Sequence, residues 1–299
     1  MSPDLTKKVF QTTVFSDGPG GGNPCPVVLD ADDLSAQQGM LLAERFMAET
    51  IFVTSSKKLP AQFRFRYFVP RQEMEMCVHG TIAAVTVLRT LKMIATPVVQ
   101  IETALGPISV EWQEDNETII VTVNQFAPEF STQNPTVQEV AEVLRLPDMS
   151  SIRQDLPIVS VSTSRHKLIV PLKSVQILDQ LRPDFEAMWA LCDRFNTTGI
   201  YPFASMEGDG VYAARQFPKR IGYDEDPATG VAACALGAYL SRFHTRNEGW
   251  NSFVILQGRA MGRPSRLIAK ALLEGNTVRE TSVTGKAVIL NCESISVAP

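Results

Sequence analysis

The segment Arg66-Tyr67-Phe68 recurs 149 residues further along the chain as Arg215-Gln216-Phe217. The same offset relates two further pairs of segments, Ile51-Phe52 with Ile200-Tyr201 and Ile82-Ala83-Ala84 with Val231-Ala232-Ala233. The offset is about half of the 299 residues, and it holds in three separate pairs of segments. The sequence therefore predicts two halves with the same architecture. The seam between two such halves is a natural place for a binding cleft.

Composition excludes several classes of function. The chain carries a net charge of −4 without a basic run, which argues against nucleic acid as a partner. The sequence contains no run of 18 apolar residues, so we expect no membrane span. The N-terminus does not have the pattern of a secretory signal. The five cysteines are odd in number and form no CxxC pair, so we expect a reducing, cytoplasmic environment. The three histidines have no zinc-like spacing, and we expect neither metal nor cofactor.

Hydrophobic patterning predicts an α+β fold. The strands and helices expected in the two halves are, in turn, strands 9–15, 26–29, 50–53, 63–68, 98–103, 108–112 and 118–124 with helices 34–49 and 80–92, then strands 158–162, 167–170, 212–217, 252–257, 267–273 and 282–289 with helices 136–146, 185–195 and 229–243. Helices 80–92 and 229–243 are apolar nearly all round, which is typical of burial within a sheet. We therefore predict two pseudo-symmetric halves, residues 1–127 plus 282–299 and residues 128–281, each a barrel-like, mostly antiparallel sheet around a central apolar helix.

The two apolar helices begin after polar turns, Cys77-Val78-His79-Gly80-Thr81 and Asp226-Pro227-Ala228-Thr229-Gly230. Helix N-termini offer unpaired N–H groups and partial positive charge, so the pair predicts a cradle for a carboxylate. The alternative is that both turns only cap their helices. The offset places Asp226, and no second thiol, opposite Cys77, so a two-thiol racemase mechanism is unsupported.

Glu49, His79 and Asp226 are the candidate acid/base residues. Apolar neighbours at a helix-to-strand junction suit Glu49 for proton transfer, and a histidine such as His79 at a helix start can pass a proton in either direction as neutral imidazole. Each has a structural alternative: Glu49 an exposed residue at a frayed helix end, His79 a packed or capping residue, and Asp226 an ordinary acidic helix start.

The motifs resemble those of the phenazine-biosynthesis PhzF-like isomerases, which are related in fold to diaminopimelate epimerase. The matching segments run in family order: Gly22-Asn23-Pro24, Ala48-Glu49-Thr50-Ile51-Phe52-Val53, Tyr67-Phe68-Val69-Pro70, Cys77-Val78-His79-Gly80-Thr81, Glu225-Asp226-Pro227-Ala228-Thr229-Gly230, Gln257-Gly258 and Met261-Gly262-Arg263-Pro264-Ser265. The resemblance implies a cofactor-free, homodimeric isomerase that shifts a proton on a small cyclic carboxylic or amino acid in a biosynthetic pathway of secondary metabolism.

The resemblance also implies roles. Glu49 takes a proton from one carbon and returns it to another, while His79 and Asp226 shape the site and assist. The residues expected to bind the substrate carboxylate and its surroundings are Asn23, Val78, Gly80, Thr81, Thr229, Gly230 and Val231. Val78 and Val231 depart from the family pattern, which commonly has Gly and Ser there, so we expect a different, less polar substrate or a loss of catalysis. The alternatives are an epimerase or racemase that uses Cys77, and a non-catalytic small-molecule or protein-binding member of the family.

Overall fold

The computed structural model describes residues 5–58 and 60–297. Their contacts group into two compact units: unit 1 comprises Met1–Ser16, Gly22–Asn124 and Thr284–Pro299, and unit 2 comprises Asp17–Gly21 and Gln125–Val283. The short segment 17–21 groups with unit 2 because the Asp17 backbone N–H donates to the Pro264 carbonyl (3.1 Å). Along the described chain, no helix is both long and apolar enough to cross a membrane.

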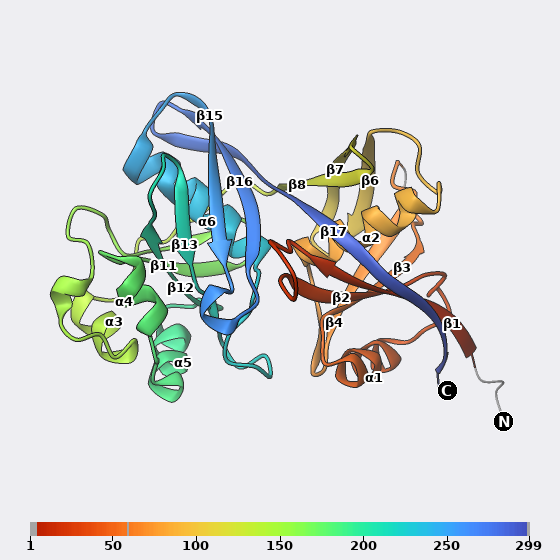
Figure 1. The fold of residues 1–299 in the computed structure, drawn as a ribbon, viewed down its shortest axis with the longest axis horizontal. Helices are drawn as coiled ribbons and strands as arrows, with labels where there is room; N and C mark the ends of the chain where they lie inside the picture. The colour runs from red at the N-terminus through yellow and green to blue at the C-terminus, as the bar shows by residue number, and fades with distance from the viewer. Residues whose placement is uncertain (1–4, 59, 298–299) are drawn as a thin grey trace. The chain divides into compact units, whose positions relative to one another are not determined.

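Unit 1 is a closed, mostly antiparallel sheet (Figure 1). Its strands are β1 (Leu5–Val14), β2 (Asn23–Val28), β3 (Thr50–Ser55), β4 (Phe63–Val69), the short β5 (Gln72–Met74), β6 (Val98–Thr103), β7 (Gly106–Asp115), β8 (Thr118–Gln125) and the last part of β17 (Thr277–Val297). The hydrogen-bonded ring runs β1-β2-β3-β4-β6-β7-β8-β17 and returns to β1. Helix α2 (Val78–Thr90) packs on β1, β2 and β3, and its residues 78–88 are all buried.

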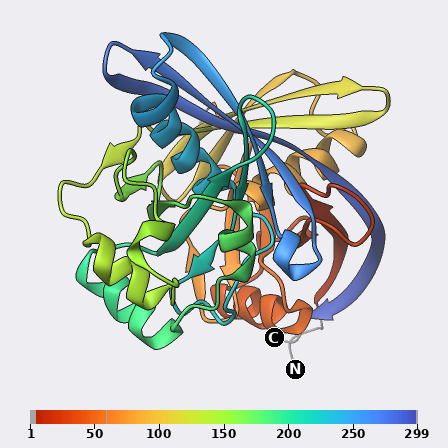
Figure 2. The same ribbon diagram turned by 60° about the vertical axis from the view of Figure 1, so that its left-hand side comes forward.

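Unit 2 repeats this plan with additional helices. Its strands are β9 (Glu129–Phe130), β10 (Val159–Ser162), β11 (His166–Pro171), β12 (Gly199–Ser205), β13 (Val211–Ala214), β14 (Phe217–Pro218), β15 (Gly249–Gln257) and β16 (Ser265–Glu274). Helix α6 (Gly230–Leu240) is buried along its whole length against β10, β11, β15 and β16, and a π-helical turn, Ser241–Thr245, continues it. Figure 2 shows α3 (Val137–Val143), α4 (Val175–Gln180) and α5 (Phe185–Arg194) gathered beside the strands of this unit.

The two units share one connectivity. The parallel pairs β2–β3 and β4–β6 in unit 1 correspond to β11–β12 and β13–β15 in unit 2. The other strand pairs whose register is defined are antiparallel. Helix α1 (Ala36–Phe46) and α5 begin 149 residues apart, and so do β3 and β12. The predicted fold class, paired barrel-like sheets around apolar helices, is therefore confirmed.

The structure differs from several local expectations; for example, the predicted strand 212–217 ends at Ala214. The helix predicted over 34–49 ends at Phe46, because Met47 adopts a left-handed conformation (φ 51°) that closes it. Strand β12 was not predicted as an element, since Pro202 interrupts its apolar run and a proline usually argues against an interior strand. The proline is accommodated opposite Val170, and its carbonyl still accepts from the Arg215 backbone N–H (3.0 Å).

Candidate active site

In unit 1, the catalytic candidates meet at the start of α2. Cys77 caps this helix, and its sulfur accepts a hydrogen bond from the Gly80 backbone N–H (3.3 Å). Glu49 lies beyond the end of α1, immediately before β3, and its Oε2 is 2.9 Å from Cys77 Sγ. The same Oε2 is 3.3 Å from His79 Nε2. The predicted pair Glu49 and His79 is thus brought together, and Cys77 contacts both residues.

Burial decides which groups of this cluster can meet a ligand. The His79 side chain is only 5% exposed, whereas the Glu49 side chain is 13% exposed and retains access to solvent. Burial, and then the neighbouring Glu49 carboxylate and Cys25, raise the pKa of the Cys77 thiol well above its ordinary value. The thiol is therefore protonated at neutral pH, and it donates its proton to Glu49.

Tyr67 and Thr81 fix the helix start from the side of β4. The Tyr67 hydroxyl and the Thr81 hydroxyl lie 2.8 Å apart, and Thr81 Oγ1 also donates to the Cys77 carbonyl (2.8 Å). A Cβ added to Gly80 would meet Cys77 Sγ and the Tyr67 ring, each at 3.3 Å. Close packing between the ring and the sulfur thus explains a glycine at this position of the helix.

In unit 2, Asp226 lies before the first turn of α6. Its backbone N–H donates to the Gln216 carbonyl (3.1 Å), and its backbone carbonyl accepts from Gln257 Nε2 (2.6 Å). Its carboxylate accepts a hydrogen bond from the Thr229 hydroxyl. Gln257 Oε1 in turn accepts from the Tyr201 hydroxyl (2.8 Å) and from the Thr229 backbone N–H (3.2 Å). Asp226 is therefore held at both its backbone and its side chain.

The starts of α2 and α6 differ. Thr229 is the N-cap residue of α6, but its hydroxyl bonds Asp226 instead of the first-turn N–H groups. The next two residues, Gly230 and Val231, belong to this first turn, and neither receives a side-chain cap from Thr229. N–H groups at a helix start without a side-chain cap are suited to an anion.

The other predicted binding residues lie at these helix starts, except Asn23, which lies on β2. Val78 opens α2 and is 1% exposed, so its branched side chain is packed inside unit 1. Asn23 opens β2, is buried, and pairs with Val14 of β1. Val231 is 7% exposed. Sequence reasoning missed the supporting residues Tyr201 and Gln257, although Gln257 stands in a motif and Tyr201 in the repeat.

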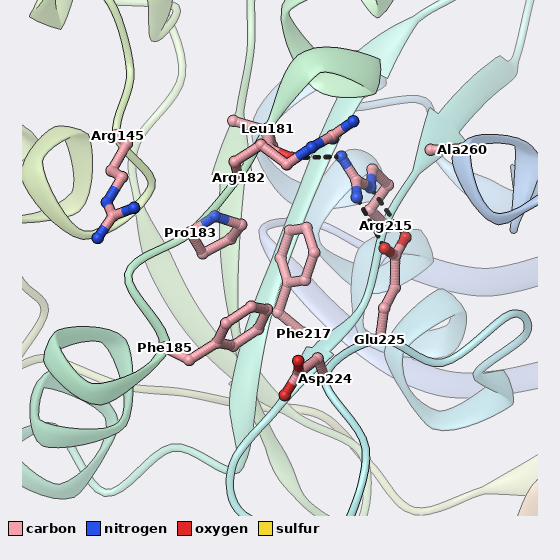
Figure 3. A pocket seen from close by; sticks show the side chains of 10 residues that line it. All are labelled: Arg145, Leu181, Arg182, Pro183, Phe185, Arg215, Phe217, Asp224, Glu225 and Ala260. Atoms are coloured by element: carbon pink, nitrogen blue, oxygen red, sulfur yellow. Dashed lines mark hydrogen bonds and ion pairs between the residues drawn. The ribbon is translucent and has the colours of Figure 1, made fainter.

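A separate cavity of unit 2, of about 390 Å³, lies beside the Asp224-Glu225 segment (Figure 3). Arg215 crosses its wall and forms a two-pronged pair with Glu225, Nε to Oε1 at 2.8 Å and Nη2 to Oε2 at 2.7 Å. Because Glu225 directly precedes Asp226, this pair fixes the chain that enters the α6 turn. The residues that line the cavity include neither Asp226 nor Thr229.

Comparison with known proteins identifies the family. The model of the phenazine biosynthesis-like proteins matches residues 12–292. An uncharacterized isomerase, YfhB, of Bacillus subtilis is 31% identical over 94% of this chain and 96% of its own length. The trans-2,3-dihydro-3-hydroxyanthranilate isomerase of Pseudomonas chlororaphis is 30% identical over 92% and 94%. A PhzF-family crystal structure from Bacillus anthracis superposes with a TM-score of 0.87 at 27% identity, over 97% of this chain and 99% of that one. The chain therefore belongs to the PhzF-like family of isomerases.

Proposed function

We propose that this isomerase moves a proton between two carbons of a small cyclic carboxylic or amino acid without a cofactor, with Glu49 as the general acid/base. The observation that carries the proposal is the cluster at the start of α2. Glu49 keeps solvent access while its Oε2 contacts the Cys77 thiol and His79 Nε2. A carboxylate held by two hydrogen-bonding groups is oriented for proton transfer, and positioned acid/base groups contribute on the order of 10²–10⁴-fold in rate.

In this proposal the other residues bind and orient. The His79 imidazole, 3.3 Å from Glu49, assists by exchanging a proton with it. Asp226, fixed by Thr229 and Gln257, serves the polar or amino group of the substrate. The N–H groups at the start of α6 contribute to carboxylate binding. A homodimeric state and a cytoplasmic location remain predictions.

Isotope exchange tests the role of Glu49. Wild type and Glu49→Gln are incubated in deuterated water with a panel of cyclic acids that includes trans-2,3-dihydro-3-hydroxyanthranilate, the compound named for the relative. We expect wild type to incorporate deuterium and Glu49→Gln to lose at least about 100-fold in rate. Glu44→Gln, which alters an exposed glutamate on α1, is the matched control and should exchange as wild type does. Equal exchange by Glu49→Gln and wild type refutes the assignment.

The position of Cys77 favours a second candidate function. Its sulfur contacts both Glu49 Oε2 and His79 Nδ1 (3.3 Å). Either group can accept the thiol proton of Cys77, and the thiolate that results can act as a base. An epimerase that uses this sulfur as its base loses activity in Cys77→Ser. Full deuterium exchange by Cys77→Ser excludes this mechanism and leaves Glu49 as the base.

A further inference from the structure

One buried side chain of unit 2 has a polar end that no other described residue satisfies. Gln216 is 1% exposed, and neither its Oε1 nor its Nε2 has a hydrogen-bond partner among residues 5–58 and 60–297. An unbonded buried amide costs free energy, and buried polar groups are normally bonded to protein, water or ligand. Gln216 is therefore a candidate for contact with a ligand.

The backbone places Gln216 beside Asp226. The two residues form an antiparallel bridge, and the Gln216 carbonyl accepts a hydrogen bond from the Asp226 backbone N–H (3.1 Å). Directly opposed residues of an antiparallel pair project from the same face, with Cβ atoms about 4.5–5.5 Å apart. The Gln216 carboxamide and the Asp226 carboxylate therefore leave the backbone toward the same side. On that side the Thr229 hydroxyl at the start of α6 bonds Asp226.

The equivalent residue of unit 1 also faces a helix start, but its surroundings are filled. Tyr67, 149 residues before Gln216, has its hydroxyl 2.8 Å from Thr81 Oγ1, and a Cβ added to Gly80 would lie 3.3 Å from its ring. In unit 2 the residues equivalent to Tyr67 and Thr81 are Gln216 and Gly230, and both are smaller. The start of α6 thus has neither the ring nor the hydroxyl that fill this place at the start of α2.

The contacts of β12 give the same direction for the amide. A Cβ added to Gly199, the first residue of this strand, would lie 2.5 Å from Gln216 Nε2. Tyr201 projects from the same face as position 199, because side chains alternate along a strand. The Tyr201 hydroxyl donates to Gln257 Oε1, and Gln257 Nε2 donates to the Asp226 carbonyl. The amide therefore lies on the face of β12 that is turned toward the Asp226 segment.

The two side chains restrict the kind of group that can bind between them. The Asp226 carboxylate only accepts hydrogen bonds, whereas the Gln216 carboxamide has an acceptor oxygen and two N–H donors. A carboxylate of the ligand would be repelled by Asp226, and an apolar group would leave the amide unbonded. An amino group donates to both residues, and a hydroxyl donates to Asp226 while it accepts from Gln216 Nε2.

We propose that Gln216 is a specificity-determining residue that, together with Asp226, binds an amino or hydroxyl substituent of the substrate acid. The inference rests on the proposed function, because it assigns one part of the same substrate. The substituent supplies the hydrogen bonds that the buried amide lacks in the free protein. Acids that carry such a substituent therefore bind more tightly than acids that lack it.

Isothermal titration calorimetry with benzoate, anthranilate and salicylate tests this assignment. The three probes share a carboxylated ring and differ in the neighbouring substituent, which is hydrogen, amino or hydroxyl. We expect wild type to bind anthranilate or salicylate at least about tenfold more tightly than benzoate, and Gln216→Met to reduce this preference at least about fivefold. Gln176→Met, which alters an exposed glutamine on α4 of the same unit, is the matched control and keeps the preference.

Thermal unfolding of the ligand-free proteins separates a binding role from a structural one. Methionine has nearly the volume of glutamine and no amide to desolvate, so Gln216→Met should raise the unfolding midpoint by about 2 °C or more. A midpoint at or below that of wild type shows that the amide is already bonded in the free protein, and it overturns the proposal. A wild type that has no preference among the probes, or binds none of them, also overturns it.

Deuterium exchange distinguishes this inference from the proposed function. If the preference depends on Gln216 while wild type exchanges no deuterium into any cyclic acid, the proposed function fails and the contact stands. If wild type exchanges deuterium while Gln216→Met keeps the full preference, only the role of Gln216 is refuted.

Discussion

Arg66 and Arg215 occupy equivalent positions of the repeat, and each pairs with a glutamate, but the two pairs differ in burial. In unit 2, Arg215 and Glu225 are 6% and 13% exposed. In unit 1, Arg66 pairs with Glu73 through the same two-pronged contact, both bonds at 2.8 Å, but these side chains are 20% and 32% exposed. The substitutions Glu225→Gln and Glu73→Gln therefore remove the same charge from the same geometry at two depths.

The expected losses follow from this difference. Removing one partner of a buried ion pair costs about 3–5 kcal/mol, because the other charge is left without compensation. In Glu225→Gln the amide oxygen still accepts one bond, and Arg215 Nη1 still donates to the carbonyls of Leu178 (3.0 Å) and Leu181 (3.1 Å). We therefore expect a loss near the lower limit, about 3 kcal/mol. Solvent screens the pair in unit 1, so Glu73→Gln should cost about 1 kcal/mol or less.

Urea unfolding measured by circular dichroism and by tryptophan fluorescence tests this ranking. Glu44→Gln, on the exposed face of α1, should change the free energy of unfolding by less than about 0.5 kcal/mol. Equal losses in Glu225→Gln and Glu73→Gln, or a larger loss in Glu73→Gln, refute the argument that burial decides the strength of these pairs. An unchanged stability in Glu225→Gln refutes it outright.

Three further outcomes are expected. Tyr67→Phe removes the bond to the Thr81 hydroxyl, which keeps its bond to a backbone carbonyl, so thermal unfolding should register a loss of about 1 kcal/mol; an unchanged melting temperature contradicts this. Gly39→Ala places a Cβ 2.6 Å from the Phe68 ring. We expect the free energy of unfolding to fall by about 1–3 kcal/mol, although alanine is the better helix former, and a gain in stability contradicts this. Cys292 is the only exposed cysteine of the five, so a thiol reagent at pH 8 should label it alone and reach the other four only in urea; fast native labelling of a second thiol contradicts this.

The repeat made much of the fold predictable from sequence. A helix that is apolar nearly all round is expected to be buried by the sheet of a strand-rich half, and both α2 and α6 are buried in this way. Element ends were less predictable, because a left-handed residue such as Met47 leaves no mark in the apolar period. Strand β12 was missed because Pro202 looks like a strand breaker when its neighbours in the sheet are unknown.

The candidate site was predictable as a set of residue types but not as a geometry. Glu49 and His79 are far apart in sequence, and the contact between them depends on how β3 meets the start of α2. Cys77 was predicted only as the residue used by an alternative epimerase or racemase, and its contacts with Glu49 and His79 were not predicted. Gln257 reaches the Asp226 turn from β15, and no local pattern predicts that long-range bond.

Some equivalent positions of the two halves make the same contacts, and the positions next to them do not. Arg66 and Arg215 each pair with a glutamate and each lie over the phenylalanine two residues later, at 5.0 Å and 4.8 Å from the ring centroid. The next position in each half has diverged: Tyr67 donates to or accepts from a hydroxyl, whereas neither amide atom of the buried Gln216 has a hydrogen-bond partner among the described residues. A buried amide without partners costs free energy unless a ligand or water supplies them. The repeated contacts therefore stabilise the scaffold. The diverged residues contact the start of the buried helix in their own unit, Tyr67 through the Thr81 hydroxyl and Gln216 through its carbonyl, which accepts from the Asp226 backbone N–H.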